Sequence, residues 1–189
     1  MIRLLSRFAP MVVLAAAVPA LAAQLPSASG HYRIDPASHI GCHVGQVGGG
    51  GLSGAIPAVS GTFDIDRHDL SRSAVEVTLR PASVATGQSR IDAFLRSNAV
   101  FDAEDHPQIT FRSTRVVATG PKSATIEGVL TARGVSRREI FQATLTDEGS
   151  DRMGFHVTGD IFRSPYGMDV GTPIYSNIVT FDMQLQGVR

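Results

Sequence analysis

Three side chains that could bind a metal ion, Asp35, His39 and His43, follow one another at intervals of four residues. On a helix this spacing would bring a carboxylate and two imidazoles to one face, as in a zinc site. Pro36 and the alternating pattern after it favour an extended chain instead, in which His39 and His43 lie ~13 Å apart at about 3.3 Å per residue. We therefore predict no metal site and interpret these residues as surface or capping groups.

Two other residue patterns resemble a catalytic triad and a calcium site but lack essential parts of each motif. With six histidines the chain could assemble a Ser-His-Asp hydrolase, but it lacks the Gly-x-Ser-x-Gly elbow and the strand-turn-helix unit that carries it. Asp64, Asp66 and Asp69 resemble a calcium loop, yet the glycine and terminal glutamate of that motif are missing. We predict that the protein is not an enzyme and keep a hydrolase only as a third alternative.

The glycine run at residues 48–51 lacks the Lys-Ser/Thr of a phosphate loop, and the single lysine, Lys122, is far away in sequence. We predict a flexible hairpin tip there. Cys42 is the only cysteine, so no intrachain disulfide can form. It shares its side of the extended chain with Ile40 and Val44, which favours a buried small hydrophobe; a reactive or intermolecular thiol is the alternative.

The elements that must position these residues are strands, because apolar and polar residues alternate along most of the chain. Gly, Pro, Asp and Ser clusters separate eight candidates, enough to close a small antiparallel barrel, so the fold class is all-β. The eight strand candidates are residues 38–47, 58–66, 73–81, 107–117, 123–132, 137–146, 153–162 and 177–187.

Two stretches interrupt the strand pattern. Ile91, Phe94 and Leu95 recur at helical spacing within residues 88–96, which predicts a short helix over one barrel end, between the third and fourth strand candidates. Residues 163–177 are rich in Pro, Gly and Tyr and form a long loop, and loops of this length are often functional.

Residues 1–23 have the order of a secretory signal peptide: Arg3 and Arg7, an apolar run, then small residues ending at Ala22 or Ala23. The apolar run is too short to span a bilayer, and no later segment approaches that length. We expect one exported domain, residues 24–189, in the periplasm or medium. With 17 basic and 17 acidic residues and no block of one sign, nucleic acid is a poor candidate partner.

The inward face of the strands is apolar, and either a packed core or a ligand cavity fits this pattern. Gly128, Ala143 and Gly159 are small residues with inward parity, so we expect them to leave room along the barrel axis.

Seven segments in order cover nearly all of the chain after the leader. Together they resemble the YceI-like, polyisoprenoid-binding family of bacterial secreted proteins. The segments are residues 32–39 (YRIDPASH), 61–66 (GTFDID), 90–97 (RIDAFLRS), 101–102 (FD), 107–113 (PQITFRS), 128–135 (GVLTARGV) and 163–167 (RSPYG).

The resemblance implies a lipocalin-like antiparallel barrel around a long apolar tunnel for an isoprenoid chain, and binding or carriage rather than catalysis. No cofactor is implied beyond an isoprenoid or isoprenoid quinone as cargo. The chain departs from the family at Cys42 and Gln46, where an aromatic residue and a histidine are common, and in residues 48–57, which are glycine-rich and longer than usual. The expected tunnel lining is Ile40, Cys42, Val44, Phe63, Val77, Phe94, Phe101, Ile109, Phe111, Leu130, Phe141, Phe155, Val157, Phe181 and Met183, and the expected mouth is Arg163, Tyr166, Tyr175 and Asn177.

The leading hypothesis is therefore a periplasmic carrier whose partner is a long-chain isoprenoid or other lipid, with a homodimer as a further possibility. The alternative is a ligand-free barrel that acts as an interaction or stress-response module.

Overall fold

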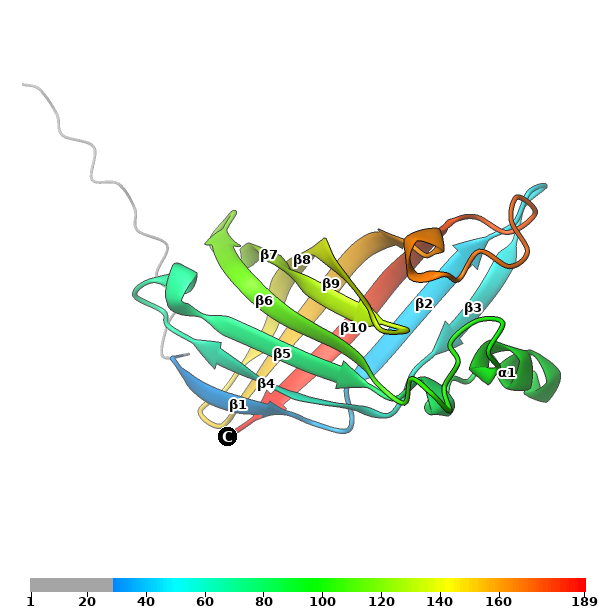
Figure 1. Cartoon of the computed structure of the whole chain (residues 1–189). Helices are drawn as coiled ribbons and strands as arrows, with labels where there is room; N and C mark the ends of the chain where they lie inside the picture. The colour runs from blue at the N-terminus through cyan, green and yellow to red at the C-terminus, as the bar shows by residue number, and fades with distance from the viewer. Residues whose placement is uncertain (1–28) are drawn as a thin grey trace, which may run out of the picture.

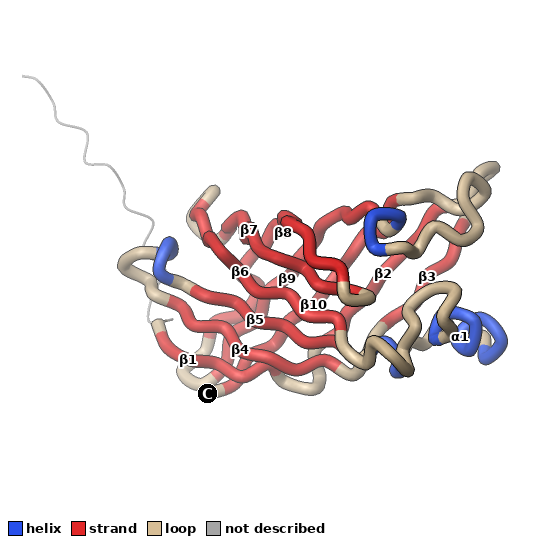
Figure 2. Tube along the Cα trace, in the orientation of Figure 1, coloured by secondary structure: helices blue, strands red, loops and turns tan. Residues whose placement is uncertain are grey.

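The structure is a computed structural model that describes residues 29–189, so the predicted signal peptide lies outside the described residues. Strands make up most of it, with one α-helix and three short 3₁₀ turns (Figures 1 and 2). The strands are β1 Gly30–Ile34, β2 His39–Gly45, β3 Gly51–Ala55, β4 Val59–Ile65, β5 Ala74–Leu79, β6 Ile109–Ala118, β7 Ser123–Ala132, β8 Val135–Glu148, β9 Arg152–Phe162 and β10 Ile178–Val188; the helix is α1 Ser89–Arg96 and the 3₁₀ turns are η1 Leu70–Arg72, η2 Pro81–Ser83 and η3 Ser164–Tyr166.

The strands close into an antiparallel barrel in the order β1-β4-β5-β6-β7-β8-β9-β10, and β10 pairs back to β1. The other two strands, β2 and β3, occupy no further positions around the barrel; they make its wall longer. β2 pairs with β10 farther along the edge that β1 uses, and β3 pairs with β2. The ten segments thus fill eight positions around the barrel, which confirms the predicted eight-stranded antiparallel barrel.

β1 and β2 together form one position of the barrel wall. The strand is interrupted between them, next to Pro36, because proline cannot donate a ladder hydrogen bond. Ser38 restores the lost pairing: its hydroxyl accepts from the Gln186 amide at 2.9 Å and donates to the Gln186 carbonyl at 3.2 Å. Pro57 lies in the matching break between β3 and β4. Neither β1 nor β3 was predicted from the sequence; each has five residues, and they carry few of the alternating apolar residues that mark the longer strands.

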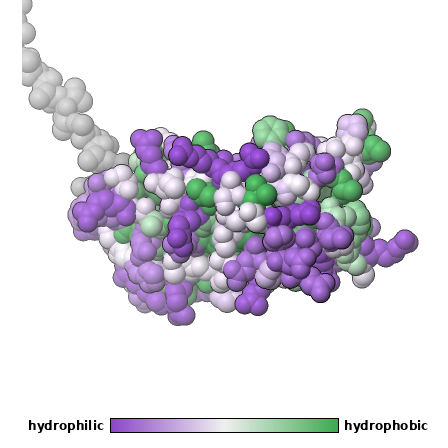
Figure 3. Space-filling model, in the orientation of Figure 1, coloured by the Kyte–Doolittle hydropathy of each residue, from purple (hydrophilic) through white to green (hydrophobic). Residues whose placement is uncertain are grey.

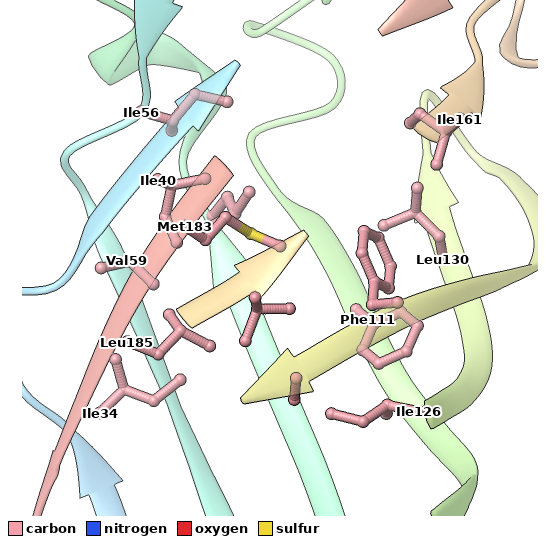
Figure 4. Packing of buried hydrophobic residues seen from close by; sticks show 14 of the residues in the cluster. Ile34, Ile40, Ile56, Val59, Phe111, Ile126, Leu130, Ile161, Met183 and Leu185 are labelled. Atoms are coloured by element: carbon pink, nitrogen blue, oxygen red, sulfur yellow. The ribbon is translucent and has the colours of Figure 1, made fainter. Parts of the chain in front are cut away.

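Alternation of side chains builds the interior as predicted. Phe141, Ala143 and Leu145 of β8 are buried, whereas Gln142 and Thr144 between them are exposed. In Figure 4 apolar side chains from several strands, among them Phe111 and Leu130 on one side and Met183 and Leu185 on the other, point into the barrel.

The predicted helix is present as α1, between β5 and β6, which are the third and fourth of the predicted strands. It lies beyond one end of the barrel (Figure 1). The Asp92 carboxylate accepts from the Thr86 amide at 2.7 Å and from the Thr86 hydroxyl at 2.6 Å, which fixes the helix to the segment before it. The loop that follows β9 runs past the same end of the barrel (Figure 2).

The inward glycines do not leave room along the axis, which corrects the sequence-based expectation. The Phe111 ring fills the space beside Gly128, and Phe141 Cδ1 lies 2.6 Å from where a Cβ on Gly159 would be. Ala143, in contrast, is buried and does border interior space, a cavity of about 80 Å³. Glycine next to a phenylalanine lets the ring lie flat on the backbone, so the two glycines accommodate aromatic packing.

Candidate functional site

The barrel holds an apolar cavity of about 520 Å³ at the end where α1 and the loop of residues 163–177 lie. This volume falls in the range of small-molecule sites, about 300–1,000 Å³. Apolar side chains form nearly all of its wall. The expected tunnel residues that line it are Cys42, Val44, Val77, Phe94, Phe101, Ile109, Phe111, Leu130, Phe141, Val157, Phe181 and Met183, and the expected mouth residues are Arg163 and Tyr175.

Three expected tunnel residues lie elsewhere. Ile40 is fully buried in the wall, and Phe63 and Phe155 line a second cavity of about 80 Å³ toward the other end. The two rings meet edge to face, with centroids 5.4 Å apart. Val75, Ile126, Val157 and Leu185 line both cavities. The interior therefore contains two neighbouring cavities, where the resemblance implied one long tunnel.

Three aromatic rings shape the inner part of the larger cavity. Phe141 meets both Phe111 and Phe181 edge to face, at centroid separations of 5.2 and 6.2 Å. Such contacts are favourable beyond the burial of area and hold the rings in place. The apolar surface at this depth is therefore preformed.

Several lining residues were missed by the sequence analysis. Ile91 and Leu95 of α1 had been recognised as a helix face but not as cavity wall, and Leu52 belongs to the missed strand β3. Further lining residues that were not predicted lie on strands: Val75, Leu79, Ile126, Ala132, Ile161, Val179 and Leu185. Others lie outside the strands, before and after α1, between β3 and β4, or in the loop after β9: Ile56, Val84, Thr86, Val100, Met168 and Val170. Loop residues have no period-two signal that could have assigned them to the cavity.

Arg163 organises the loop that borders the cavity. Its guanidinium donates to the carbonyls of Ser176 at 2.8 Å, Val170 at 2.9 Å and Tyr175 at 3.3 Å, and also to that of Met168. Burial lowers the pKa of Arg163, and the charge of Asp169 acts in the opposite direction. Because the planar guanidinium offers five N–H donors, this one side chain can bind four backbone carbonyls of the irregular loop.

Tyr166 and Asn177 do not face the cavity, which corrects their assignment to the mouth. The Tyr166 hydroxyl donates to Glu139 Oε1 at 2.7 Å, and burial together with this carboxylate raises the pKa of Tyr166. Asn177 Oδ1 accepts from the Ser164 amide at 2.8 Å and the Ser164 hydroxyl at 2.6 Å. Both side chains stabilise the loop instead.

Arg133 links the segment after α1 to the loop after β9, and both of these segments border the larger cavity. Its Nη1 donates to the Val100 carbonyl at 3.0 Å on one side and to the Gly167 carbonyl at 2.8 Å on the other. Arg133 and Gly134 form the two-residue turn between β7 and β8, with φ of +49° and +73°. Positive φ is unfavourable for arginine, so the hydrogen bonds of the side chain compensate for a strained backbone.

Cys42 faces the larger cavity and is half-buried. Its thiol lies 3.5 Å from the Gly54 carbonyl, and burial raises the pKa of Cys42. Within residues 29–189 no three His, Cys, Asp or Glu side chains gather as a metal site would require. His43 instead contacts the Ser53 hydroxyl at 2.9 Å, and the Asp35 carboxylate accepts from the Ala37 amide at 2.8 Å.

The acidic residues of the superficial calcium motif also have structural partners. Asp66 accepts from the amides of His68 at 3.0 Å and Asp69 at 3.2 Å, and Asp69 caps η1 by accepting from Ser71. These contacts are those of turn and capping residues.

A closed antiparallel barrel with an apolar cavity at one end defines a lipocalin-like binding barrel. The YceI-like domain matches residues 32–187, and the chain belongs to the YceI-like family. A UPF0312 protein of Photorhabdus laumondii is 31% identical over 167 residues, which are 84% of this chain and 86% of that protein.

Solved structures show the same fold. BcnA of Burkholderia cenocepacia superposes with a TM-score of 0.75 at 23% identity, covering 81% of this chain and 98% of that one. A polyisoprenoid-binding domain from Saccharophagus degradans, implicated in plant cell wall breakdown, superposes with a TM-score of 0.67 at 16% identity, covering 83% and 97%. Between residues 29 and 189, no helix is long and apolar enough to cross a bilayer.

Proposed function

We propose that the protein binds the chain of an isoprenoid, or of another long apolar lipid, in the larger cavity and carries it outside the cytoplasm. The observation that carries this proposal is the cavity itself, about 520 Å³ bordered almost entirely by apolar side chains. Family membership and the polyisoprenoid-binding name of the Saccharophagus domain support the same ligand class.

Burial of apolar surface alone can supply the affinity. Each buried CH₂-sized group contributes about 0.8 kcal/mol, so a few isoprene units give a gross gain above ~10 kcal/mol before the ordering costs are subtracted. The protein needs no polar groups along the cavity to recognise the apolar lipid chain. A polar head group, for example that of an isoprenoid quinone, would lie at the entrance, near Tyr175 and Arg163.

The role is binding and carriage, with cargo in place of a cofactor. The signal-like order of residues 1–23 supports export to the periplasm or medium. Mass spectrometry of the protein recovered from the periplasmic fraction tests export, with Gln24 or Ala23 as the expected first residue. A full-length chain in the inner membrane would overturn it.

Cargo is tested by organic extraction and mass spectrometry of the purified protein, followed by binding of geranylgeraniol to the delipidated form. Cys42→Trp and Val44→Trp add bulk from the cavity wall, whereas His43→Trp places a tryptophan on the outward side of the same strand. We expect both inward variants to lose extractable lipid and geranylgeraniol binding while the far-UV spectrum is retained, and the outward variant to match the wild type.

If the wild type yields no lipid and binds no geranylgeraniol, the carrier proposal is wrong and the ligand-free interaction module takes its place. Equal binding by the inward and outward tryptophan variants would place the ligand outside this cavity.

A further inference from the structure

Two loops join into one projection beside the cavity entrance, which we call the lip: residues 45–51, at the β2–β3 turn, and residues 170–177, before β10. The Val47 amide donates to the Ile174 carbonyl at 2.9 Å, and the Ser176 amide donates to the Gly45 carbonyl at 2.8 Å. The bridge between Gln46 and Tyr175 lies between these bonds. In Figure 1 the lip extends past the barrel at the upper right.

The lip has no Asp, Glu, Lys, Arg or His and exposes apolar side chains. Residues 44–63 and 170–181 contain no Asp, Glu, Lys or Arg, although such residues make up 18% of the chain. Val47 is 75% exposed and Ile174 59% exposed, and Val170 and Tyr175 are also exposed. Figure 3 shows apolar side chains at this end of the molecule, beside a strongly hydrophilic surface lower down.

The apolar surface of the lip continues into the cavity. Val170 and Tyr175 belong both to the lip and to the cavity wall, and Phe94 of α1 is the exposed apolar residue of that wall on the helix side. Gly48, Gly49 and Gly50 have positive φ, and no atom lies within 4 Å of the Cβ position of any of them. The outermost turn therefore has open space beside it, and its glycines permit more backbone conformations than other residues would.

We propose that the lip docks on a phospholipid bilayer, with Val47 and Ile174 in the boundary between head groups and acyl chains and the cavity entrance turned toward the lipid. Interfacial binding scales with the buried apolar area and needs no shape complementarity. Tyrosine, with an apolar ring and a polar tip, suits the same depth. The role of this membrane contact rests on the proposed lipid cargo. Binding to vesicles is nevertheless measured separately from binding of lipid in the cavity.

A second copy of the chain fits the lip less well than a bilayer does. A stable interface buries about 800 Å² on each partner, and four exposed side chains on a narrow projection do not provide it.

The chain has no tryptophan, so a single introduced one reports on its position alone. Val47→Trp places the reporter on the lip, and Ser150→Trp places it in the β8–β9 turn at the opposite end of the barrel. With vesicles of phosphatidylethanolamine and phosphatidylglycerol, we expect Trp emission from the lip variant to shift to shorter wavelength and to be quenched by brominated lipid, and emission from the control to stay unchanged.

Vesicle flotation gives the second measurement. The double variant Val47→Asp/Ile174→Asp should bind vesicles more weakly than the wild type by on the order of tenfold, because transfer of a carboxylate into the membrane interface is unfavourable. Ile140→Asp is the matched control, since Ile140 is 54% exposed on the outer wall of β8. All variants carry the same N-terminus, which is verified by mass spectrometry.

Absence of wild-type flotation, or equal loss in the lip variant and the Ile140 control, would overturn the docking proposal. Self-association in sedimentation that the lip substitutions abolish would overturn it in favour of a homodimer. Geranylgeraniol binding without vesicles should be retained in the lip variant. If vesicle binding fails while this binding is retained, only the docking proposal is wrong.

Discussion

The ring of Phe111 occupies the space that a β-carbon on Gly128 would need, across the β6–β7 pair. The same arrangement recurs where Phe141 lies on Gly159 and Phe63 on Gly187. Each glycine lets a neighbouring ring lie against bare backbone, so the ring projects less far into the barrel. The glycines of the inner wall thus contribute to the cavity indirectly, through the rings that they accommodate.

Gly128→Ala should therefore destabilise the barrel, because the added methyl group would displace Phe111 and approach the Arg112 carbonyl. Overpacking of this kind costs about 1–3 kcal/mol in the free energy of unfolding, measured by urea denaturation. Gly120→Ala is the control, since its nearest atom would be 3.8 Å away. Phe111→Leu should recover part of the loss when combined with Gly128→Ala, and strict additivity of the two variants would argue against the contact.

Arg133→Gly separates the backbone strain at the β7–β8 turn from the hydrogen bonds of the side chain. Glycine accepts the positive φ of +49°, so the unfolding free energy should change by less than about 1 kcal/mol. The links to Val100 and Gly167 are lost. We expect faster hydrogen exchange in residues 97–102 and 164–168 and faster release of geranylgeraniol. Unchanged exchange in both segments would show that Arg133 does not hold the entrance together.

Arg163→Lys should loosen the loop before β10 and leave the barrel closed. An ammonium group cannot reach the four carbonyls that the guanidinium holds, and each buried carbonyl left without a donor costs about 1–3 kcal/mol. Chymotrypsin should cut the variant earlier at Tyr175, with little change in the far-UV spectrum. Arg138→Lys, at an exposed position on β8, is the control and should resist like the wild type.

Cys42 should react slowly with iodoacetamide, with a rate profile displaced to higher pH than that of a free thiol. Burial raises its pKa, so at any pH below the midpoint a smaller fraction is the reactive thiolate. The measurement is the alkylation rate between pH 7 and pH 10, compared in the native and urea-denatured states. We also expect geranylgeraniol to slow the native rate further, because Cys42 lines the cavity. A native rate equal to the denatured one would place the thiol on the surface.

Strand parity predicts which side chains point inward but not how deep they lie. Phe63, Phe111 and Phe155 all point inward as expected, yet only Phe111 borders the larger cavity, because depth depends on register around the closed barrel. Register is a long-range property that follows from pairing between distant segments. Parity could therefore predict the barrel and its apolar interior but not the division of that interior into two cavities.

Loop residues were predicted least well, since no periodicity orients them. Tyr166 and Asn177 were assigned to the mouth because they carry polar groups within the predicted long loop, and hydrogen bonds to Glu139 and Ser164 direct them elsewhere. Arg163 was assigned in the same way and does line the cavity, although its donors hold backbone carbonyls. Export of residues 24–189 and a homodimer remain predictions.

β10 is the last strand of the chain and pairs with β9, β1 and β2, so no closed wall exists until residues 178–188 have been synthesised. A nascent chain that is still growing has an open sheet and no enclosed cavity. If the cavity binds lipid as proposed, uptake therefore requires that residues 178–188 have joined the sheet. If the chain crosses the inner membrane unfolded, as the proposed leader implies, it arrives empty, and the place of translocation decides which pool of lipid it meets first.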